Sequence, residues 1–446
     1  MHIVVIGLGE VGRHLLKVLD GDGHDVVAVD NDPERVREAE EHQDVATLLG
    51  YGASHETLVQ VGVSMADLVV AVTDNDEVNL IAALAAQRLG AKKVVARAQS
   101  NEWARWTEGV RYGLLGVDVV INPRVLLAQE LAKIARSHGA SEVIDLAQER
   151  IELVEIDIKA ETRNTGKPLA QLPIPRNALV AAVVRHDELF VPGGADVLLP
   201  GDRVYLIGRP EAVVDAEDMF TNRREAQRIC IVGGGVIGEA LARALSKEGA
   251  KIMLIEKNRD RAHQLSATLD SVTVVHGDGT NVELLKEEEV GSYDLFAAVT
   301  PEDEVNLMAS LLARRVEVPR TACVVHRGDY MDIYRQLGID IALSPRIVAS
   351  DHILRYARTD LIQSMATLEG GKAEVVELTA RKGCRAIGLP LKRMNLPRGA
   401  LLAAIVHGEK VIIPRGDDEV HCDDAVILLT TAEARPTVER LFRPRS

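Results

Sequence analysis

Residues 3–12 read IVVIGLGEVG, an apolar run that leads into three glycines, Gly7, Gly9 and Gly12. The continuous apolar run at 3–6 is typical of a strand buried on both faces, and an amphipathic helical pattern follows at 11–19. In the spacing G-x-G-x-x-G, the first glycine permits a tight turn, the second lets the backbone approach a pyrophosphate, and the third allows a helix to pack closely on a sheet. This stretch therefore predicts a Rossmann-type domain whose first helix presents free N–H groups to phosphate.

An acidic residue completes this nucleotide-binding pattern. Asp30 ends the next predicted strand, 18 residues after Gly12. A carboxylate at that place accepts hydrogen bonds from the ribose hydroxyls of NAD and disfavours the 2′-phosphate of NADP. The alternative is a degenerate fold that keeps its glycines for packing alone. The residues predicted to bind the cofactor here are Gly7, Leu8, Gly9, Glu10, Val11, Gly12 and Asp30.

The same pattern occurs twice in the chain. Residues 229–238 read ICIVGGGVIG, 226 positions after the first motif. The motif AVTDNDEVNL at 71–80 returns as AVTPEDEVNL at 298–307, and GVDVVINPR at 116–124 returns as GIDIALSPR at 338–346. The same order with drifting offsets indicates a duplication with small insertions and deletions. The acids of the shared DEVN motif either favour the positive end of a helix dipole or serve a ligand or an interface.

The second copy repeats the nucleotide-binding features. Glu256 follows Gly238 by 18 residues and can take the same ribose contact as Asp30. The alternative is a duplicated domain that has lost its ligand. The residues predicted to bind the cofactor here are Gly233, Gly234, Gly235, Val236, Ile237, Gly238 and Glu256.

Further candidates lie after other predicted strands, because ligands of such sheets bind at the carboxyl ends of the strands. Thr73 and Asp74 follow the strand predicted at 68–72, and Arg97 follows the strand predicted at 94–96. A planar guanidinium suits a bidentate phosphate contact, and a surface salt bridge is the alternative role for Arg97.

Matching candidates occur in the second half. Thr300 belongs to the second AVT motif, and Asp278 stands in a G-D-G-T loop where the first half has Tyr51. His326 is taken as the counterpart of Arg97.

Each half divides into two parts of different character. The first part alternates predicted strands and helices, which favours an α/β, Rossmann-like, doubly wound parallel sheet. The second part has short apolar runs broken by turn residues, which favours a small β-rich α+β domain. We expect nucleotide-binding domains at 1–140 and 223–364 and small domains at 141–222 and 365–446, with a charged segment at 211–227 joining the halves.

Composition excludes several classes of function. The 446 residues include 52 Lys and Arg against 67 Asp and Glu, a net charge of −15, so no nucleic-acid partner is expected. No stretch approaches 18 apolar residues and no basic leader precedes the first strand, so neither a membrane-spanning helix nor a signal peptide is expected. The four cysteines form no C-x-x-C pair, and Cys230 and Cys323 are expected as buried thiols in a reducing cytoplasm.

The sequence offers no catalytic centre. A dehydrogenase needs a substrate domain with a general acid or base facing the nicotinamide, and the two small domains show few histidines and no obvious catalytic cluster. The histidines lack H-x-x-x-H spacing on any predicted helix, so no metal site is expected. An NAD-dependent oxidoreductase with duplicated cofactor domains is the alternative.

With these features, the chain resembles the regulator-of-potassium-conductance family, and within it the TrkA-type peripheral subunits of bacterial and archaeal Trk/Ktr potassium uptake systems. The resemblance rests on IGLGEVG and VGGGVIG, on Asp30 and Glu256, on the paired AVT-x-x-DEVN motifs, and on the VPGG and IPRG turns. It covers nearly the whole chain. It implies binding of NAD(H), with ATP or ADP as further ligands, and a homo-oligomer (a dimer, tetramer or ring) on the cytoplasmic face of an integral membrane potassium-translocating subunit.

The resulting hypothesis is a cytoplasmic regulatory subunit, peripheral on the inner face of the cell membrane, which performs no catalysis. It would gate a membrane potassium transporter or channel in response to NAD(H) or ATP/ADP, through different affinities of the ligand for two states. A regulator of a potassium/proton antiporter, built from the same modules, is a further alternative. Since Tyr51 replaces the aspartate of the family's G-D-x-[ST] loop, the two sites are expected to differ in ligand.

Overall fold

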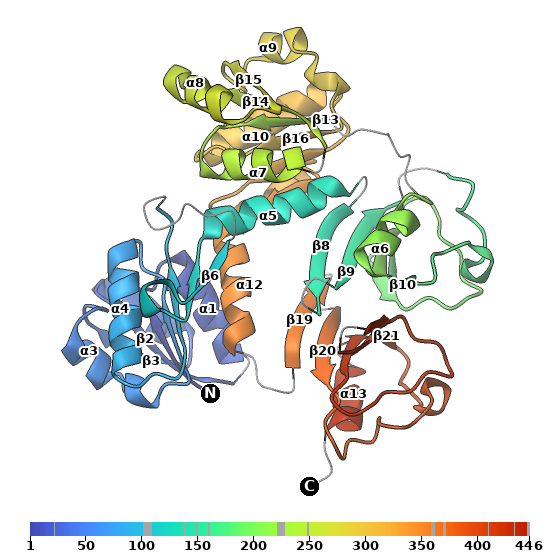
Figure 1. Cartoon of the computed structure of the whole chain (residues 1–446), viewed down its shortest axis with the longest axis horizontal. Helices are drawn as coiled ribbons and strands as arrows, with labels where there is room; N and C mark the ends of the chain where they lie inside the picture. The colour runs from blue at the N-terminus through green and yellow to red at the C-terminus, as the bar shows by residue number, and fades with distance from the viewer. Residues whose placement is uncertain are drawn as a thin grey trace. The chain divides into compact units, whose positions relative to one another are not determined.

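The computed structural model describes two compact units, each built from a segment of both halves of the chain (Figure 1). The first unit contains Met1–Ala132 and Ala226–Ala357, and the second contains Lys133–Glu225 and Arg358–Ser446. The described residues are 1–21, 23–100, 109–137, 140–147, 150–158, 161–220, 228–247, 249–357, 362–368, 372–408, 410–431 and 433–443.

A seven-stranded sheet forms the first nucleotide domain, in the order β3-β2-β1-β4-β5-β7-β6. Its strands are β1 (His2–Ile6), β2 (Asp25–Asp30), β3 (Ala46–Leu49), β4 (Leu68–Ala71), β5 (Val94–Arg97), β6 (Val110–Tyr112) and β7 (Val119–Ile121), and its helices are α1 (Glu10–Gly21), α2 (Pro33–His42), α3 (His55–Gln60) and α4 (Asp76–Arg88). All strands pair in parallel except β6, which is antiparallel to β7. The strand order reverses between β1 and β4, which is where ligands bind in such sheets.

The second nucleotide domain repeats this design with a six-stranded parallel sheet in the order β15-β14-β13-β16-β17-β18. Its strands are β13 (Arg228–Val232), β14 (Lys251–Glu256), β15 (Val272–His276), β16 (Leu295–Ala298), β17 (Thr321–Val324) and β18 (Ile341–Leu343), and its helices are α7 (Val236–Lys247), α8 (Arg259–Thr268), α9 (Val282–Glu287), α10 (Asp303–Arg315) and α11 (Met331–Gln336). The strand order reverses between β13 and β16, and the second glycine motif directly follows β13.

Each nucleotide domain ends in a helix, α5 (Pro123–Arg136) in the first half and α12 (Pro345–Ala357) in the second. Helix α12 packs against α1, a helix of the other half, as Figure 1 shows. Tyr356 of α12 also meets the residue before β5, since the Lys93 ammonium lies 4.3 Å from the centre of its ring. The second half of the chain therefore contributes directly to the first nucleotide domain.

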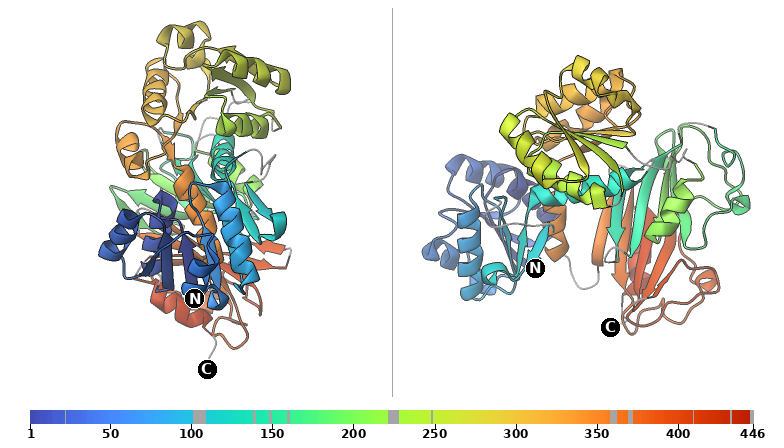
Figure 2. Two further views of the ribbon diagram at one scale, coloured as in Figure 1. Left: turned by 90° about the vertical axis from the view of Figure 1, so that its left-hand side faces the viewer. Right: turned by 45° about the horizontal axis from the view of Figure 1, so that its top comes forward.

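The second unit consists of two antiparallel five-stranded sheets, the two C-lobes (Figure 2). The first C-lobe contains β8 (Ala140–Leu146), β9 (Ile151–Asp157), β10 (Ala178–Arg185), β11 (Glu188–Phe190), β12 (Arg203–Gly208) and α6 (Pro210–Glu217), and the second contains β19 (Ile362–Leu368), β20 (Ala373–Thr379), β21 (Ala400–His407), β22 (Lys410–Ile412), β23 (Ala425–Thr431) and α13 (Arg435–Phe442). One apolar core joins both lobes, with Ala182 and Tyr205 from the first and Val375 and Ile427 from the second. The α/β fold class with β-rich C-lobes is therefore confirmed.

Some elements differ from the sequence-based expectation. Strands β3 and β6 were not expected, since both are short strands at sheet edges with much of their surface exposed. The charged segment expected at 211–227 begins instead as helix α6, which packs on the first C-lobe sheet through Val213 and Ala216. Residues 221–227 of that segment lie outside the described part of the chain.

Two of the cysteines lie in central strands of the second nucleotide domain, Cys230 in β13 and Cys323 in β17. Cys230 and Cys323 are buried, as expected, and burial raises the pKa of the Cys323 thiol to about 12. No helix within the described ranges has the length and apolar character needed to cross a bilayer.

Candidate functional site

The first glycine turn is shaped by two close approaches. Gly7 has φ +100°, and a Cβ placed on it would lie 2.7 Å from the Thr73 backbone nitrogen. A Cβ on Gly12 would lie 1.9 Å from the Gly7 carbonyl oxygen, so α1 packs directly on the turn. By contrast, the nearest atom to a Cβ on Gly9 would be 3.9 Å away. The side of the turn at Gly9 is therefore open to a ligand.

The motif residues between these glycines contribute mainly through their backbone. The side chains of Leu8 and Val11 are buried in the domain core. Glu10, by contrast, starts α1, and its carboxylate is half-exposed.

Asp30 holds the turn against the end of β2. Its Oδ2 accepts a hydrogen bond from the Leu8 backbone N–H (2.6 Å), and its Oδ1 accepts one from Asp32 (2.9 Å). The Arg35 guanidinium lies 3.7 Å from Oδ2, and the carboxyl side chain is only 5% exposed. A carboxylate has about four lone-pair sites, so Asp30 keeps acceptor capacity for the hydroxyls of a ribose.

A cavity of about 310 Å³ lies at this switch point of the sheet. It includes residues from the ends of four parallel strands and the loops after them: Ile6, Gly7, Val29, Asp30, Asn31, Arg35, Gly50, Tyr51, Gly52, Thr73, Asp74, Asn75 and Val78. Tyr51 is 53% exposed and offers a flat ring at the cavity wall. The sequence thus predicted Gly7, Asp30, Thr73 and Asp74 at this cavity, but it gave no reason to include Arg35.

A second cavity of about 190 Å³ adjoins the turn and contains four arginines, namely Arg13, Arg35, Arg97 and Arg346. Gly9, Glu10, Val11, Val72 and Asp74 complete its lining. Arg346 comes from the start of α12, and its guanidinium forms an ion pair with the Glu10 carboxylate. The second half of the chain therefore supplies one cation beside the first glycine turn.

The loop after β4 is held by buried polar side chains. Fully buried Asn79 accepts hydrogen bonds from Thr73 N–H (2.8 Å) and Thr73 Oγ1 (2.7 Å), and its amide donates to the Thr73 and Arg97 carbonyls. Asp76 accepts from the backbone N–H groups of Gln99 and Ser100. The DEVN motif thus connects the loops after β4 and β5.

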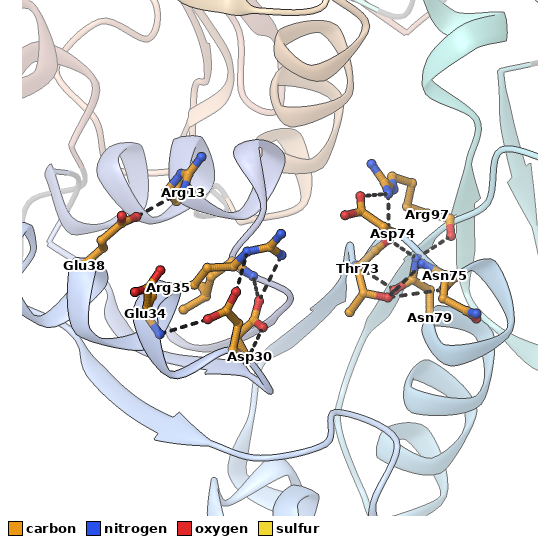
Figure 3. A network of polar contacts seen from close by, with 12 residues as sticks. Arg13, Asp30, Glu34, Arg35, Glu38, Thr73, Asp74, Asn75, Asn79 and Arg97 are labelled. Atoms are coloured by element: carbon orange, nitrogen blue, oxygen red, sulfur yellow. Dashed lines mark hydrogen bonds and ion pairs between the residues drawn. The ribbon is translucent and has the colours of Figure 1, made fainter.

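Arg97 crosses from β5 to this loop. Its Nη2 donates to the Thr73 carbonyl (2.7 Å) and to Asp74 Oδ1 (3.0 Å) (Figure 3). Burial lowers the pKa of the Arg97 guanidinium, and the Asp74 carboxylate opposes that shift. An arginine stays protonated in proteins, so Arg97 places a fixed positive charge beside the turn.

The second glycine turn has the same backbone geometry. Gly233 has φ +103°, and a Cβ on Gly238 would lie 1.9 Å from the Gly233 carbonyl oxygen. No atom lies within 4 Å of a Cβ built on Gly235. The Glu256 carboxylate accepts from the backbone N–H groups of Gly234 and Asn258, both at 2.6 Å.

The other predicted residues of the second turn lie around this backbone. Ile237 is buried, and Val236 begins α7. Thr300 lies next to Gly233, and both its backbone N–H and its hydroxyl donate to Asn306 Oδ1 (2.8 Å).

The charges around the second turn differ from those around the first. Glu239 stands where the first turn has Arg13, directly after the last glycine of the motif. Arg261 donates to the Gly234 carbonyl (2.8 Å) and to the Glu239 carboxylate (2.6 Å). The second turn therefore already carries an anionic side chain, with this arginine paired to it.

The pairing of Arg97 with His326 was wrong. Asn79 donates to the Arg97 carbonyl, whereas its counterpart Asn306 donates to the carbonyl of Val324. Val324 is therefore the residue equivalent to Arg97, and the second site lacks the buried guanidinium. His326 corresponds instead to Gln99, since both donate a backbone N–H to the aspartate of the DEVN motif.

Asp278 lies in the loop after β15. Its carboxylate accepts from Lys257 Nζ (2.8 Å) and from both the N–H and the hydroxyl of Thr280. The Lys257 ammonium is the largest cause that lowers the pKa of Asp278 to about 2. Asp278 thus shapes its own loop by local contacts.

Fold and site together define a protein with two tandem Rossmann-type nucleotide domains. A family model of the TrkA-N domain matches residues 3–123 and 229–345, and one of the TrkA-C domain matches residues 153–221 and 375–443. The chain belongs to the TrkA family, which confirms the resemblance seen in its sequence.

Curated relatives match the chain over its full length. The Trk system potassium uptake protein TrkA homolog 1 of Methanosarcina mazei is 36% identical, over 99% of this chain and 100% of that protein. The Trk system potassium uptake protein TrkA of Vibrio alginolyticus is 31% identical, over 100% of this chain and 99% of that protein.

Solved structures share the fold at low sequence identity. The structure of the GsuK channel bound to NAD matches with a TM-score of 0.61 and 18% identity, over 99% of this chain and 78% of that one. The GsuK RCK domain matches with a TM-score of 0.59 and 19% identity, over 99% and 94% of the two chains.

Proposed function

We propose that the chain is a nucleotide-binding regulatory subunit of a potassium transport system, and that its principal ligand, NAD(H), binds in the first nucleotide domain. The observation that carries the proposal is the cavity at the β1/β4 switch point. There Asp30, which suits a ribose, lies beside a glycine turn flanked by the guanidinium groups of Arg35 and Arg97. The Asp30 carboxylate suits a ribose, and the guanidinium groups of Arg35 and Arg97 beside the turn suit the phosphates of a dinucleotide.

The same chemistry accommodates ADP or ATP, because these ligands share the adenosine and the phosphate chain of NAD(H). Each arginine of the second cavity now faces a carboxylate of the protein, such as Glu10 for Arg346 and Asp74 for Arg97. Nucleotide phosphates would take over part of this pairing. We therefore expect the affinity of the site for each nucleotide to depend on the number of negative charges on its phosphates.

The second site is proposed to bind the same class of ligand more weakly. Glu256 and the open position at Gly235 are present, but Val324 replaces Arg97 and Glu239 replaces Arg13. A carboxylate in place of one arginine, and the loss of a second arginine, disfavour phosphate at this turn.

The partner is proposed to be an integral membrane potassium-translocating subunit, with the chain as a homo-oligomer on its cytoplasmic face. This rests on the full-length relatives, which are named as Trk system potassium uptake proteins. One structure with this fold is a channel bound to NAD. Nucleotide binding would act on transport by favouring one of two conformations, and no chemical step is needed.

Calorimetric titration of the full chain with NAD⁺, NADH, ATP and ADP tests the proposal. The variant Asp30→Ala should weaken the tighter site by roughly 10- to 100-fold, the effect of losing hydrogen bonds to a charged group worth about 1.5–3 kcal/mol. The matched variant Glu256→Ala should leave that site unchanged.

Absence of binding by all four nucleotides would overturn the proposal, as would a loss of the tight site in Glu256→Ala alone. Turnover of NADH in the presence of a substrate panel would instead favour the oxidoreductase alternative. Folding of each variant is checked by far-UV circular dichroism.

A further inference from the structure

A cluster of two histidines and a buried aspartate lies in the second C-lobe, which belongs to the unit that contains neither glycine turn. His407 ends β21, and His421 and Asp424 belong to the turn that precedes β23. Within the described residues, this is the one group of three or more His, Cys, Asp or Glu side chains whose ligand atoms all lie close together, within 4.8 Å of one another.

Duplication of the chain supplies an internal comparison. In the first C-lobe, Arg185 holds Asp202 with two hydrogen bonds of 2.7 Å, one to each carboxylate oxygen. The turn is the same in both lobes, since Leu199 N–H donates to Asp202 Oδ2 and His421 N–H donates to Asp424 Oδ2, each at 2.7 Å.

Only the side chains around the aspartate have changed between the lobes. His407 takes the place of Arg185, and His421 takes the place of Leu199. His407 Nδ1 lies 2.5 Å from Asp424 Oδ1, and His421 Nδ1 lies 3.7 Å from Oδ2. A bidentate guanidinium has thus been replaced by two imidazoles, one near each carboxylate oxygen.

A buried carboxylate needs a positive charge close to it. Asp424 is only 1% exposed, like Asp202 at 2%. Arg185 gives Asp202 a permanent charge, whereas an imidazole is charged only when it binds a proton. A divalent cation held between the rings would restore a permanent charge at Asp424.

We propose that His407, His421 and Asp424 form a binding site for a divalent transition metal such as Zn²⁺, and that the first C-lobe has no equivalent site. Two imidazole nitrogens and one carboxylate oxygen are ligands of zinc at about 2.0–2.2 Å, and a water can complete such a set. Imidazole nitrogen favours zinc and its neighbours over magnesium or calcium, which prefer oxygen.

The geometry allows binding without movement of the backbone. The side chains of His407 and His421 are 62% and 64% exposed, so both rings can turn toward a shared ion while Asp424 stays fixed by the turn. Bound metal would tie the β21–β22 hairpin to the turn before β23. Gly408 of that hairpin accepts a hydrogen bond from Arg150 of the first C-lobe, so the site lies beside a contact between the two lobes.

Zinc titration of the chelator-treated full chain tests this inference. We expect the wild type to bind one zinc per chain through this cluster, measured by competition with a chromogenic chelator, and zinc to raise its unfolding temperature. The double variant His407→Arg/His421→Leu rebuilds the arrangement of the first C-lobe, so it should fold and lose this zinc. A control variant, His263→Gln/His276→Gln, removes two exposed histidines elsewhere and should bind zinc like the wild type.

The variant His421→Leu alone removes one ligand and keeps the contact between His407 and Asp424. It should weaken zinc binding by about tenfold or more, and it carries the test if the double variant does not fold. The inference is overturned if the wild type binds no stoichiometric zinc, or if the histidine variants of the cluster bind zinc as tightly as the control.

Discussion

Two glycines of the first turn are needed for different reasons, Gly12 for packing and Gly9 for access of a ligand. Substitution by alanine distinguishes the two. A methyl group on Gly12 would lie 1.9 Å from the Gly7 carbonyl oxygen, whereas one on Gly9 meets its nearest neighbour, Arg35 Nη1, at 3.9 Å. We predict that Gly12→Ala destabilises the chain by about 1–3 kcal/mol or more through overpacking, and that Gly9→Ala changes stability by about 0.5 kcal/mol at most. Urea unfolding followed by circular dichroism measures both, and equal midpoints for the two variants would contradict this account.

Asp278 gives a pH-dependent test at the second site. Its pKa is lowered from 3.8 to about 2, first through the hydrogen bond to Lys257. A lowered folded-state pKa adds stability above the unfolded pKa, and that stability is lost as the pH falls through about 2. The difference in urea midpoint between wild type and Asp278→Asn should therefore be larger at neutral pH than near pH 3, and smaller in high salt because Lys257 is exposed. A difference that is the same at every pH would show that the charge plays no part.

Residue patterns predicted the glycine turns and their acids because those features depend on a few adjacent positions. The strands that precede the two motifs, β1 and β13, are buried, and Gly7 and Gly233 have positive φ, as the motif requires. The match of Arg97 with His326 was two residues off, since the offset of 227 between the two AVT motifs places Arg97 opposite Val324. The hydrogen bonds of Asn79 and Asn306 give the correct alignment.

At the scale of elements, helix α12 connects the second half of the chain to the first glycine turn. Its Arg346 pairs with Glu10 of α1 beside the arginine-rich cavity. We predict that Arg346→Ala weakens nucleotide binding roughly 5- to 30-fold, or about 1–2 kcal/mol, because one cation is lost. Glu10→Gln should tighten binding, because a carboxylate that competes with phosphate is removed.

The control for this prediction is Arg355→Ala, which removes an exposed arginine near the other end of the same helix. It should bind nucleotide like the wild type in the same calorimetric titration. Equal affinities for Arg346→Ala and Arg355→Ala would mean that α12 has no direct role at the site.

Element prediction from sequence worked best where strands are central. Strands β1 and β4 are almost wholly buried, so each appears in the sequence as an uninterrupted apolar run. Strands β3 and β6 lie at sheet edges and carry exposed residues, and α6 has a charged exposed face, so their patterns resemble those of loops. The position of α12 against α1 depends on contacts between the two halves, which no local pattern reveals.

At the scale of the whole molecule, duplication has produced pairs of sites that differ in charge. The first turn has Arg13 and Arg97 where the second has Glu239 and Val324, and the first C-lobe has Arg185 where the second has His407. The sequence showed the repeat, but not these differences in three dimensions. The histidine cluster was missed because its two histidines are 14 residues apart, one at the end of β21 and one in the turn before β23, and follow no helical spacing.

The central claim is that nucleotide in the first domain controls potassium transport by a membrane partner. The most direct test is potassium flux into vesicles that contain the co-purified membrane subunit, with the chain added in the presence and absence of the nucleotide identified by calorimetry. We predict that nucleotide changes the flux by about 5- to 150-fold, the range of a coupling of roughly 1–3 kcal/mol, and that Asp30→Ala removes this response while Glu256→Ala keeps it. A flux that does not depend on nucleotide, or that responds equally in wild type and Asp30→Ala, would contradict the account.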